Sequence, residues 1–157
     1  MKTLVKLLLL VILVVGGLGF YQTVTQPDHL YATTGQFSGC PARPNCVSSL
    51  AKDDVHRVAA LAYTGDAGTA LSMLREVIER MGGTIEHESP GYVHAVFVTT
   101  QLHLRDDLEL LVLPEGTIEV RSISRFGYKD LGNRQRVEAL RQAFEAVPQP
   151  SSSTVMP

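Results

Sequence analysis

Residues 106–124, DDLELLVLPEGTIEVRSIS, are the part of the sequence that indicates the fold most clearly. Residues 108–113 and 117–124 are two runs rich in apolar and β-branched side chains, and such runs are typical of strands. Between them, Pro114-Glu115-Gly116 suits a three-residue hairpin loop whose glycine adopts the left-handed backbone conformation. The stretch therefore predicts an antiparallel β-hairpin.

The register of this hairpin follows from its short loop. Pairing outward from the loop places Asp106 opposite Ser124, and alternate pairs share one face of the sheet. One face is then apolar until it ends in a polar patch made by Asp106, Ser122 and Ser124. Asp107 and Arg121 point to the opposite face, which is mixed in character, and we expect that face to be partly solvated.

Two amphipathic helices are predicted, one before the strands in the sequence and one after them. Apolar residues recur every three or four positions over 67–81, Asp66 precedes them as a cap, and Gly82-Gly83 supplies a left-handed stop. A second helix follows Asn133, which can cap it, and extends to residue 147 with the same periodicity. Each helix has one apolar stripe to bury.

A further hairpin is predicted upstream of the first. Residues 84–88 and 92–99 are rich in β-branched and aromatic side chains, and Pro90-Gly91 occupies the centre of a type II turn. A short strand near 58–63 is a weaker feature. The order α-β-β-β-β-α predicts an α+β two-layer sandwich, in which a four-stranded antiparallel meander carries two helices on one face.

The amino terminus has the features of an export segment. Lys2 and Lys6 precede an apolar run over residues 7–15, and residues 4–21 would extend roughly 27 Å as a helix. That length just allows a membrane span. Gly17 and Gly19 provide the small residues of a cleavage site, so an uncleaved anchor and a cleaved signal peptide both remain open.

The positive charges before the apolar run keep the amino terminus in the cytoplasm. We therefore expect a single-pass protein of the cytoplasmic (inner) membrane with its domain on the periplasmic side, or a protein secreted to the periplasm. The expected organisation is a signal anchor or signal peptide at 1–21, a linker at 22–39, a globular domain at 40–147 and a disordered tail at 148–157.

The amino-acid composition limits the kinds of partner that the protein can bind. Lys and Arg number 14 against 16 Asp and Glu, so the net charge of −2 argues against a nucleic-acid binder. The expected partners are the membrane, through residues 4–21, and a protein or a small anion. The five histidines lack H-x-x-x-H spacing, and His94 lies in a strand between apolar neighbours, as a structural histidine does. No metal or cofactor is expected.

Cys40 and Cys46 are the two cysteines of the chain. An exported protein meets an oxidising compartment, so we expect them to form a structural disulfide. Closing a loop of about seven residues would stabilise the fold by roughly 2 kcal/mol.

Polar residues are densest between positions 121 and 136, where the last strand leads into the last helix. In one interpretation these side chains are hydrogen-bonded locally and have a structural role. In a second, arginines and the helix start form an anion-binding corner. The candidate site residues are Asp106, Arg121, Ser122, Ser124, Arg125, Asn133 and Arg134.

Four motifs together resemble the uncharacterised family catalogued as domain of unknown function 1499. They are Cys-Pro-x-x-Pro-Asn-Cys-Val-Ser-Ser at 40–49, Tyr-Val-His-Ala at 92–95, Asp-Asp-x-Glu at 106–109 and the stretch from Arg121 to Arg134. The resemblance spans roughly residues 40–141. The family that the chain resembles comprises bacterial envelope proteins and plant plastid relatives with no established activity. The resemblance therefore implies which domain the chain contains, but it implies no reaction.

The chain departs from the pattern of this family at a few positions. It has one residue fewer between Gly132 and Asn133, and it has Lys129 and Val96 where the family more often has a serine and an acid. The first departure falls next to the Asp130–Asn133 loop.

Three functions remain open on this evidence. The leading hypothesis is a non-enzymatic binding or assembly module held outside the membrane. An alternative is a hydrolase-type enzyme using Asp106 with Ser122 or Ser124, although no G-x-S-x-G elbow is present. The third is an anion or lipid-headgroup binder using Arg121, Arg125 and Arg134.

Overall fold

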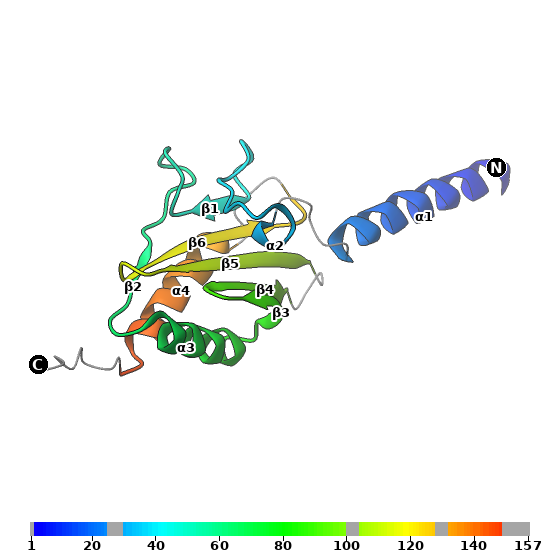
Figure 1. The fold of residues 1–157 in the computed structure, drawn as a ribbon. Coiled ribbons are helices and arrows are strands. Elements are labelled where there is room, and N and C mark those ends of the chain that lie inside the picture. Colours follow the sequence, from blue (N-terminus) through cyan, green and yellow to red (C-terminus); the bar gives the residue numbers. More distant parts are fainter. Residues whose placement is uncertain (1, 25–29, 100–103, 128–131, 149–157) are drawn as a thin grey trace, which may run out of the picture.

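The fold was analysed in a computed structural model, which describes residues 2–24, 30–99, 104–127 and 132–148. The fold is α+β and is built around one mostly antiparallel sheet (Figure 1). Its elements are α1 (Lys2–Val24), α2 (Tyr31–Thr34), β1 (Cys46–Ser48), β2 (Leu61–Ala62), α3 (Ala67–Arg80), β3 (Thr84–Ser89), β4 (Tyr92–Val98), β5 (Arg105–Leu113), β6 (Thr117–Ser124) and α4 (Asn133–Glu145).

The predicted meander is confirmed, and so is the register predicted for its last hairpin. Strands β3, β4, β5 and β6 pair in sequence order, and Asp106 lies opposite Ser124 as expected. Both hairpin loops use the expected glycines, because Gly91 has φ 76° and Gly116 has φ 87°. Only glycine adopts these angles without strain.

The sheet has six strands within the described residues, so the prediction of four was wrong. Strands β1 and β2 both pair with the free edge of β6. They are three and two residues long, which is too short for an alternating pattern to be visible in the sequence. β2 lies inside the weak strand feature at 58–63, whereas β1 follows directly from the second cysteine.

Helices α3 and α4 pack on one face of the sheet, as predicted, and their apolar stripes meet Val93, Ala95, Leu108 and Leu110 in the core. Asp66 caps α3, since its Oδ1 accepts a hydrogen bond from the Thr69 amide at 2.8 Å. Of the two glycines after α3, only Gly82 is left-handed. Gly83 has a different role, because a Cβ there would lie 2.6 Å from the Phe97 ring.

The opposite face of the sheet is covered rather than solvated, which corrects the sequence prediction. Residues 30–39, here called the strap, lie against it, and the single turn of α2 lies on the side of the sheet away from α4 (Figure 1). Leu30 is 0% exposed, and Arg121 and Glu109 beneath the strap are 1% and 0% exposed. Within the range predicted as a linker, 22–39, residues 22–24 belong to α1 and residues 30–39 form the strap.

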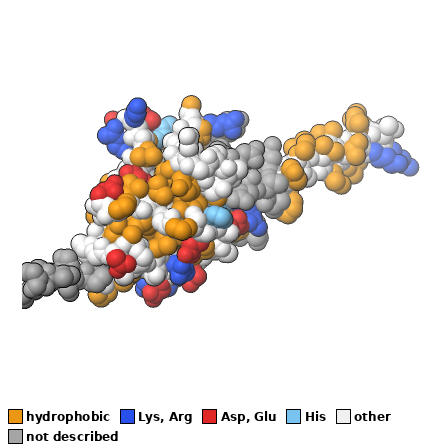
Figure 2. Space-filling model, viewed as in Figure 1, with side chains coloured by type: hydrophobic (Ala, Val, Ile, Leu, Met, Phe, Trp, Pro, Cys, Tyr) orange, Lys and Arg blue, Asp and Glu red, His pale blue; other side chains and the backbone are white. Residues whose placement is uncertain are grey.

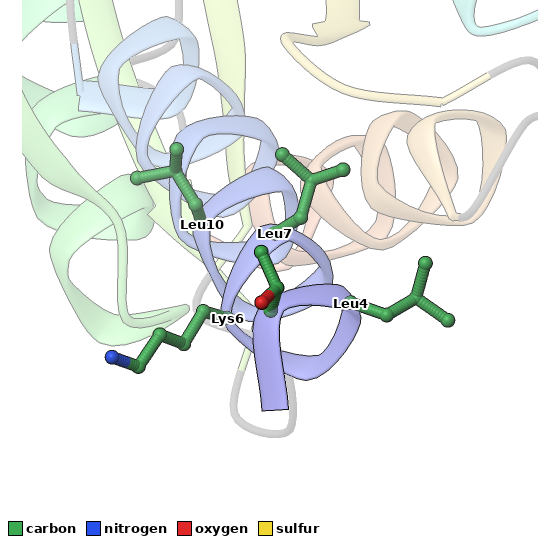
Figure 3. A pocket seen from close by; sticks show the side chains of 5 residues that line it. Leu4, Lys6, Leu7 and Leu10 are labelled. Atoms are coloured by element: carbon green, nitrogen blue, oxygen red, sulfur yellow. The ribbon is translucent and has the colours of Figure 1, made fainter. Parts of the chain in front are cut away.

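Helix α1 is rich in apolar side chains, with Lys2 and Lys6 near its start, and does not fold back onto the domain (Figure 1). Its large side chains are exposed, from Leu4 at 74% to Phe20 at 67%, and Figure 2 shows them along the helix with basic side chains at its far end. A shallow depression among Thr3, Leu4, Lys6, Leu7 and Leu10 is formed by this helix alone (Figure 3). None of the helices within the described residues has the length and apolar character needed to span a bilayer.

Several predictions fall outside the described residues. They concern His29, His103, the loop at 128–131 and positions 149–157 of the predicted tail.

The predicted disulfide is present. The sulfurs of Cys40 and Cys46 are bonded, and the two Cα atoms lie 5.6 Å apart. The bond joins the end of the strap to β1 at the sheet edge. We expect thiol labelling of the purified chain without reductant to modify neither cysteine, and we expect reductant to lower the free energy of unfolding by about 2 kcal/mol. Full labelling of both cysteines without reductant would contradict this prediction.

Candidate functional site

The polar patch predicted at the end of the apolar face is a closed hydrogen-bonded cluster, here called the core-side cluster. Its members are Asp106, Ser122, Ser124, Asn133, Arg136 and Asn45. The Asn133 amide lies at its centre: its Oδ1 accepts from the Ser122 hydroxyl at 2.8 Å, and its Nδ2 donates to Ser124 Oγ at 2.8 Å. Asn133 also donates to the backbone carbonyl of Asn45 at 3.1 Å. The amide therefore joins α4 to β6 and to the segment that precedes β1.

Asp106 is paired with Arg136, which is not among the candidate residues selected from the sequence. Arg136 Nη2 donates to Asp106 Oδ2 at 2.5 Å, and its Nη1 also reaches Ser122 Oγ and Asn133 Oδ1. Residues three apart on a helix share a face, so Arg136 points to the sheet with Asn133. The prediction of Asn133 as a cap was also wrong, because it is the first residue of α4 and Gly132 is the N-cap.

Arg134 lies on another side of α4 and contacts a different segment. Its two terminal nitrogens donate to the carbonyls of Arg57 and Val55 at 2.7 and 2.8 Å. Arg141, two turns later, donates in the same way to the carbonyls of Ala60 and Ala59 at 2.8 and 2.7 Å. These two arginines hold the segment before β2 against the helix.

The opposite face of the sheet contains a second group of polar side chains, here called the charged layer. Its members are Tyr92, His94, Asp107, Glu109, Arg121 and Arg125. Glu109 and Arg121 form an ion pair across β5 and β6 with both side chains buried. The Tyr92 hydroxyl donates to Glu109 Oε1 at 2.7 Å. Burial, and after it the negative charge of Glu109, raises the pKa of Tyr92 well above its usual value.

The other half of the charged layer is centred on Asp107. His94 Nε2 lies 2.8 Å from Asp107 Oδ1, and Arg125 donates to both carboxylate oxygens at 2.8 and 2.9 Å. Burial alone would raise the pKa of Asp107, but the hydrogen bonds from His94 and Arg125 outweigh it and hold that pKa below its usual value. Arg125 lies 3.8 Å from Glu86, which connects this pair to the surface.

The structure brings together only some of the residues selected from the sequence. Asp106, Ser122, Ser124 and Asn133 meet in the core-side cluster. Arg121 and Arg125 lie on the opposite face, and Arg134 lies apart from both groups. Sequence reasoning missed Arg136 and Asn45 in the first group, and His94, Asp107, Glu109 and Tyr92 in the second. The hairpin register already placed Glu109 opposite Arg121, so that pair was visible in the sequence although its burial was not.

The chemistry available to the core-side cluster is limited by these contacts. Nucleophilic catalysis by serine requires a hydrogen bond from its hydroxyl to a general base. Here the Ser122 hydroxyl donates to an amide oxygen, and the Ser124 oxygen accepts from the same amide. Among the described residues, no three His, Cys, Asp or Glu side chains meet in a group suited to a metal ion.

We predict that Asp106→Ala lowers the free energy of unfolding by about 1–3 kcal/mol, because it leaves donors of Arg136 inside the cluster without their acceptor. Urea denaturation followed by circular dichroism measures this change. Glu115→Ala, an acidic residue in the exposed loop that follows the same strand, is the control and is expected to leave the midpoint unchanged. An Asp106→Ala midpoint equal to that of the parent would contradict the structural role of this carboxylate.

Comparisons with known proteins agree with the resemblance found in the sequence. No curated protein matches the chain. A family model described as "Protein of unknown function (DUF1499)" matches residues 36–144, a range that begins in the strap and includes the disulfide, the whole sheet and nearly all of α4. The match covers more than half of the chain and contains both polar groups, so the chain belongs to the DUF1499 family.

Proposed function

We propose that this chain is an exported domain that acts at the membrane as a non-enzymatic binding or assembly module. The observation that carries the proposal is the pairing of its buried carboxylates. Within the part of the chain that the structure describes, each of the three has its own arginine: Asp106 pairs with Arg136, Asp107 with Arg125 and Glu109 with Arg121. Such pairing holds strands and helices in place, because each charge is neutralised inside the protein.

This pairing weakens the two alternatives drawn from the sequence. A hydrolase would need Asp106 to exchange a proton with a substrate or with a serine, but its carboxylate is bonded to Arg136. An anion binder would need guanidinium groups that converge on a ligand. Arg121 and Arg125 are bonded to carboxylates beneath the surface, and Arg134 donates to backbone carbonyls elsewhere.

The proposed location rests on the amino terminus and the disulfide. Lys2 and Lys6 precede the apolar residues of α1, whose side chains point outward and suit lipid or the export machinery. The Cys40–Cys46 bond suits an oxidising compartment. We therefore place the domain on the periplasmic side of the cytoplasmic membrane, attached through α1, or released into the periplasm if the signal is cleaved.

Two experiments test this proposal. Mass spectrometry of the mature chain isolated from the membrane fraction is expected to show that it still contains the α1 residues. A species beginning at or near Phe20 would show a released protein instead.

For the mode of action, a strain lacking this protein is complemented with the parent or with Ser122→Ala. A module is expected to work equally well with either, provided that immunoblots show equal amounts. Loss of complementation at equal abundance would favour the hydrolase.

A further inference from the structure

The docked strap leaves a short connection between helix α1 and the domain. Helix α1 ends at Val24, and Leu30, six positions later, is fully buried in the domain. An extended chain covers at most about 3.6 Å per residue, so the Cα atoms of these two residues lie within about 22 Å of each other. A domain attached to a membrane through α1 is therefore kept close to the lipid.

One end of the sheet exposes apolar side chains. At this end β4 finishes with Val98, which is 48% exposed, and Phe126, two residues beyond β6, is 49% exposed. Arg105 at the start of β5 lies between them, because it pairs with Val98 and its carbonyl accepts a hydrogen bond from the Arg125 amide at 3.0 Å. We call this part of the surface, made by Val98, Arg105 and Phe126, the Val98 end, and Figure 1 shows α1 beyond it.

The charged side chains described at the Val98 end are paired. Arg105 donates to Glu86 at 3.2 Å, and Arg125 donates to Asp107 at 2.8 Å. A charge that has lost its water is far less costly beside an opposite charge than alone. The Val98 end therefore combines two exposed apolar side chains with charges that are already neutralised.

The opposite end of the sheet has a different surface. It contains both hairpin loops, and Glu115 is exposed at the tip of the loop between β5 and β6. An exposed carboxylate is stabilised by water and opposes contact with lipid. The two ends lie about 27 Å apart, because β5 has nine residues with a rise of about 3.4 Å each. Contact with a bilayer is therefore favoured at the Val98 end.

We propose that the Val98 end rests on the membrane that holds α1, with Val98 and Phe126 inserted among the lipid headgroups. The partner of this surface is the bilayer itself. Apolar side chains that enter the boundary between headgroups and acyl chains leave water, which favours the contact. The inference rests on the proposed attachment through α1 and adds which part of the domain meets the lipid. The strap stays docked throughout.

The test uses the absence of tryptophan from the chain, which makes one introduced tryptophan the only source of its fluorescence. The full-length variant Phe126→Trp is reconstituted into phosphatidylcholine vesicles with brominated or unbrominated acyl chains. Bromine quenches tryptophan only at short range, so a tryptophan inserted at the bilayer surface is expected to lose about half of its fluorescence in the brominated vesicles. Glu115→Trp, also exposed but at the opposite end of the sheet, is the matched control and is expected to lose none.

Two further variants keep the inference falsifiable. Val98→Trp places the tryptophan on β4 and is expected to be quenched as Phe126→Trp is, so it replaces that variant if Phe126→Trp does not fold. Leu10→Trp places the tryptophan on α1 and tests the attachment itself, for which quenching is also expected.

If Leu10→Trp is quenched while Phe126→Trp and Val98→Trp are equally bright in both kinds of vesicle, the inference is overturned and the proposed attachment stands. Equal quenching of Phe126→Trp and Glu115→Trp would also overturn it, because the contact would not belong to one end of the sheet. An unquenched Leu10→Trp would contradict the attachment and the inference together.

Discussion

Replacing Arg121 with alanine is expected to lower the free energy of unfolding by about 3–5 kcal/mol, the range for breaking one side of a buried ion pair. The substitution leaves the Glu109 carboxylate fully buried without its cation. Tyr92 and the Tyr31 amide still donate to Glu109, but neither donor carries a positive charge. Urea denaturation of the full chain in detergent, followed by circular dichroism, measures the loss.

Two further variants separate the buried charge from the loss of an arginine as such. Arg75→Ala removes an arginine from an exposed pair with Glu88, and it is expected to shift the midpoint far less because water screens both charges. The double variant Glu109→Leu with Arg121→Met removes both charges and is expected to recover much of the stability lost in Arg121→Ala. If Arg75→Ala and Arg121→Ala lowered the free energy of unfolding by similar amounts, that result would contradict the burial of the Glu109–Arg121 pair.

Asp107→Asn is expected to destabilise the protein at neutral pH and to flatten its acid denaturation. The substitution removes the carboxylate that faces buried Arg125 and His94, for which we expect a loss of about 3–5 kcal/mol. In the folded parent the pKa of Asp107 lies below its unfolded value of about 3.9. Its contribution is therefore complete above the unfolded pKa and is lost as the pH falls through the folded pKa.

Denaturation midpoints measured from neutral pH to about pH 2 test this prediction. The parent is expected to lose stability over the acid range more steeply than Asp107→Asn does, so the two curves converge at low pH. Asp54→Asn, in an exposed loop, is the control and is expected to follow the parent. Parallel curves for the parent and Asp107→Asn would show that Asp107 is not the titrating group.

These expectations reverse one conclusion drawn from the sequence. With the register known, Asp106 and Asp107 must point to opposite faces, and the face of Asp107 was expected to be partly solvated. Both carboxylates are buried, with Asp106 2% and Asp107 0% exposed.

Elements with local signals could be read directly from the sequence. A turn glycine, a capping aspartate and the spacing of apolar residues depend only on neighbouring positions, so both hairpins, the register of the β5–β6 hairpin and both domain helices were predictable. The disulfide was predictable as well, because six positions separate its cysteines and the chain has no others.

Which faces and edges of the sheet are covered depends on contacts between distant parts of the chain. Strand β1 exists because β6 offers it an unpaired edge, and three residues alone have no detectable periodicity. Arg136 rather than Arg134 meets Asp106, because the exact start of α4 sets which side chains point to the sheet. The strap docks on Glu109 through Tyr31, although these two residues lie 78 positions apart in the chain. Whether a charged side chain is buried depends on such distant segments. A sequence pattern shows only which side chains lie near one another along a single strand, helix or hairpin.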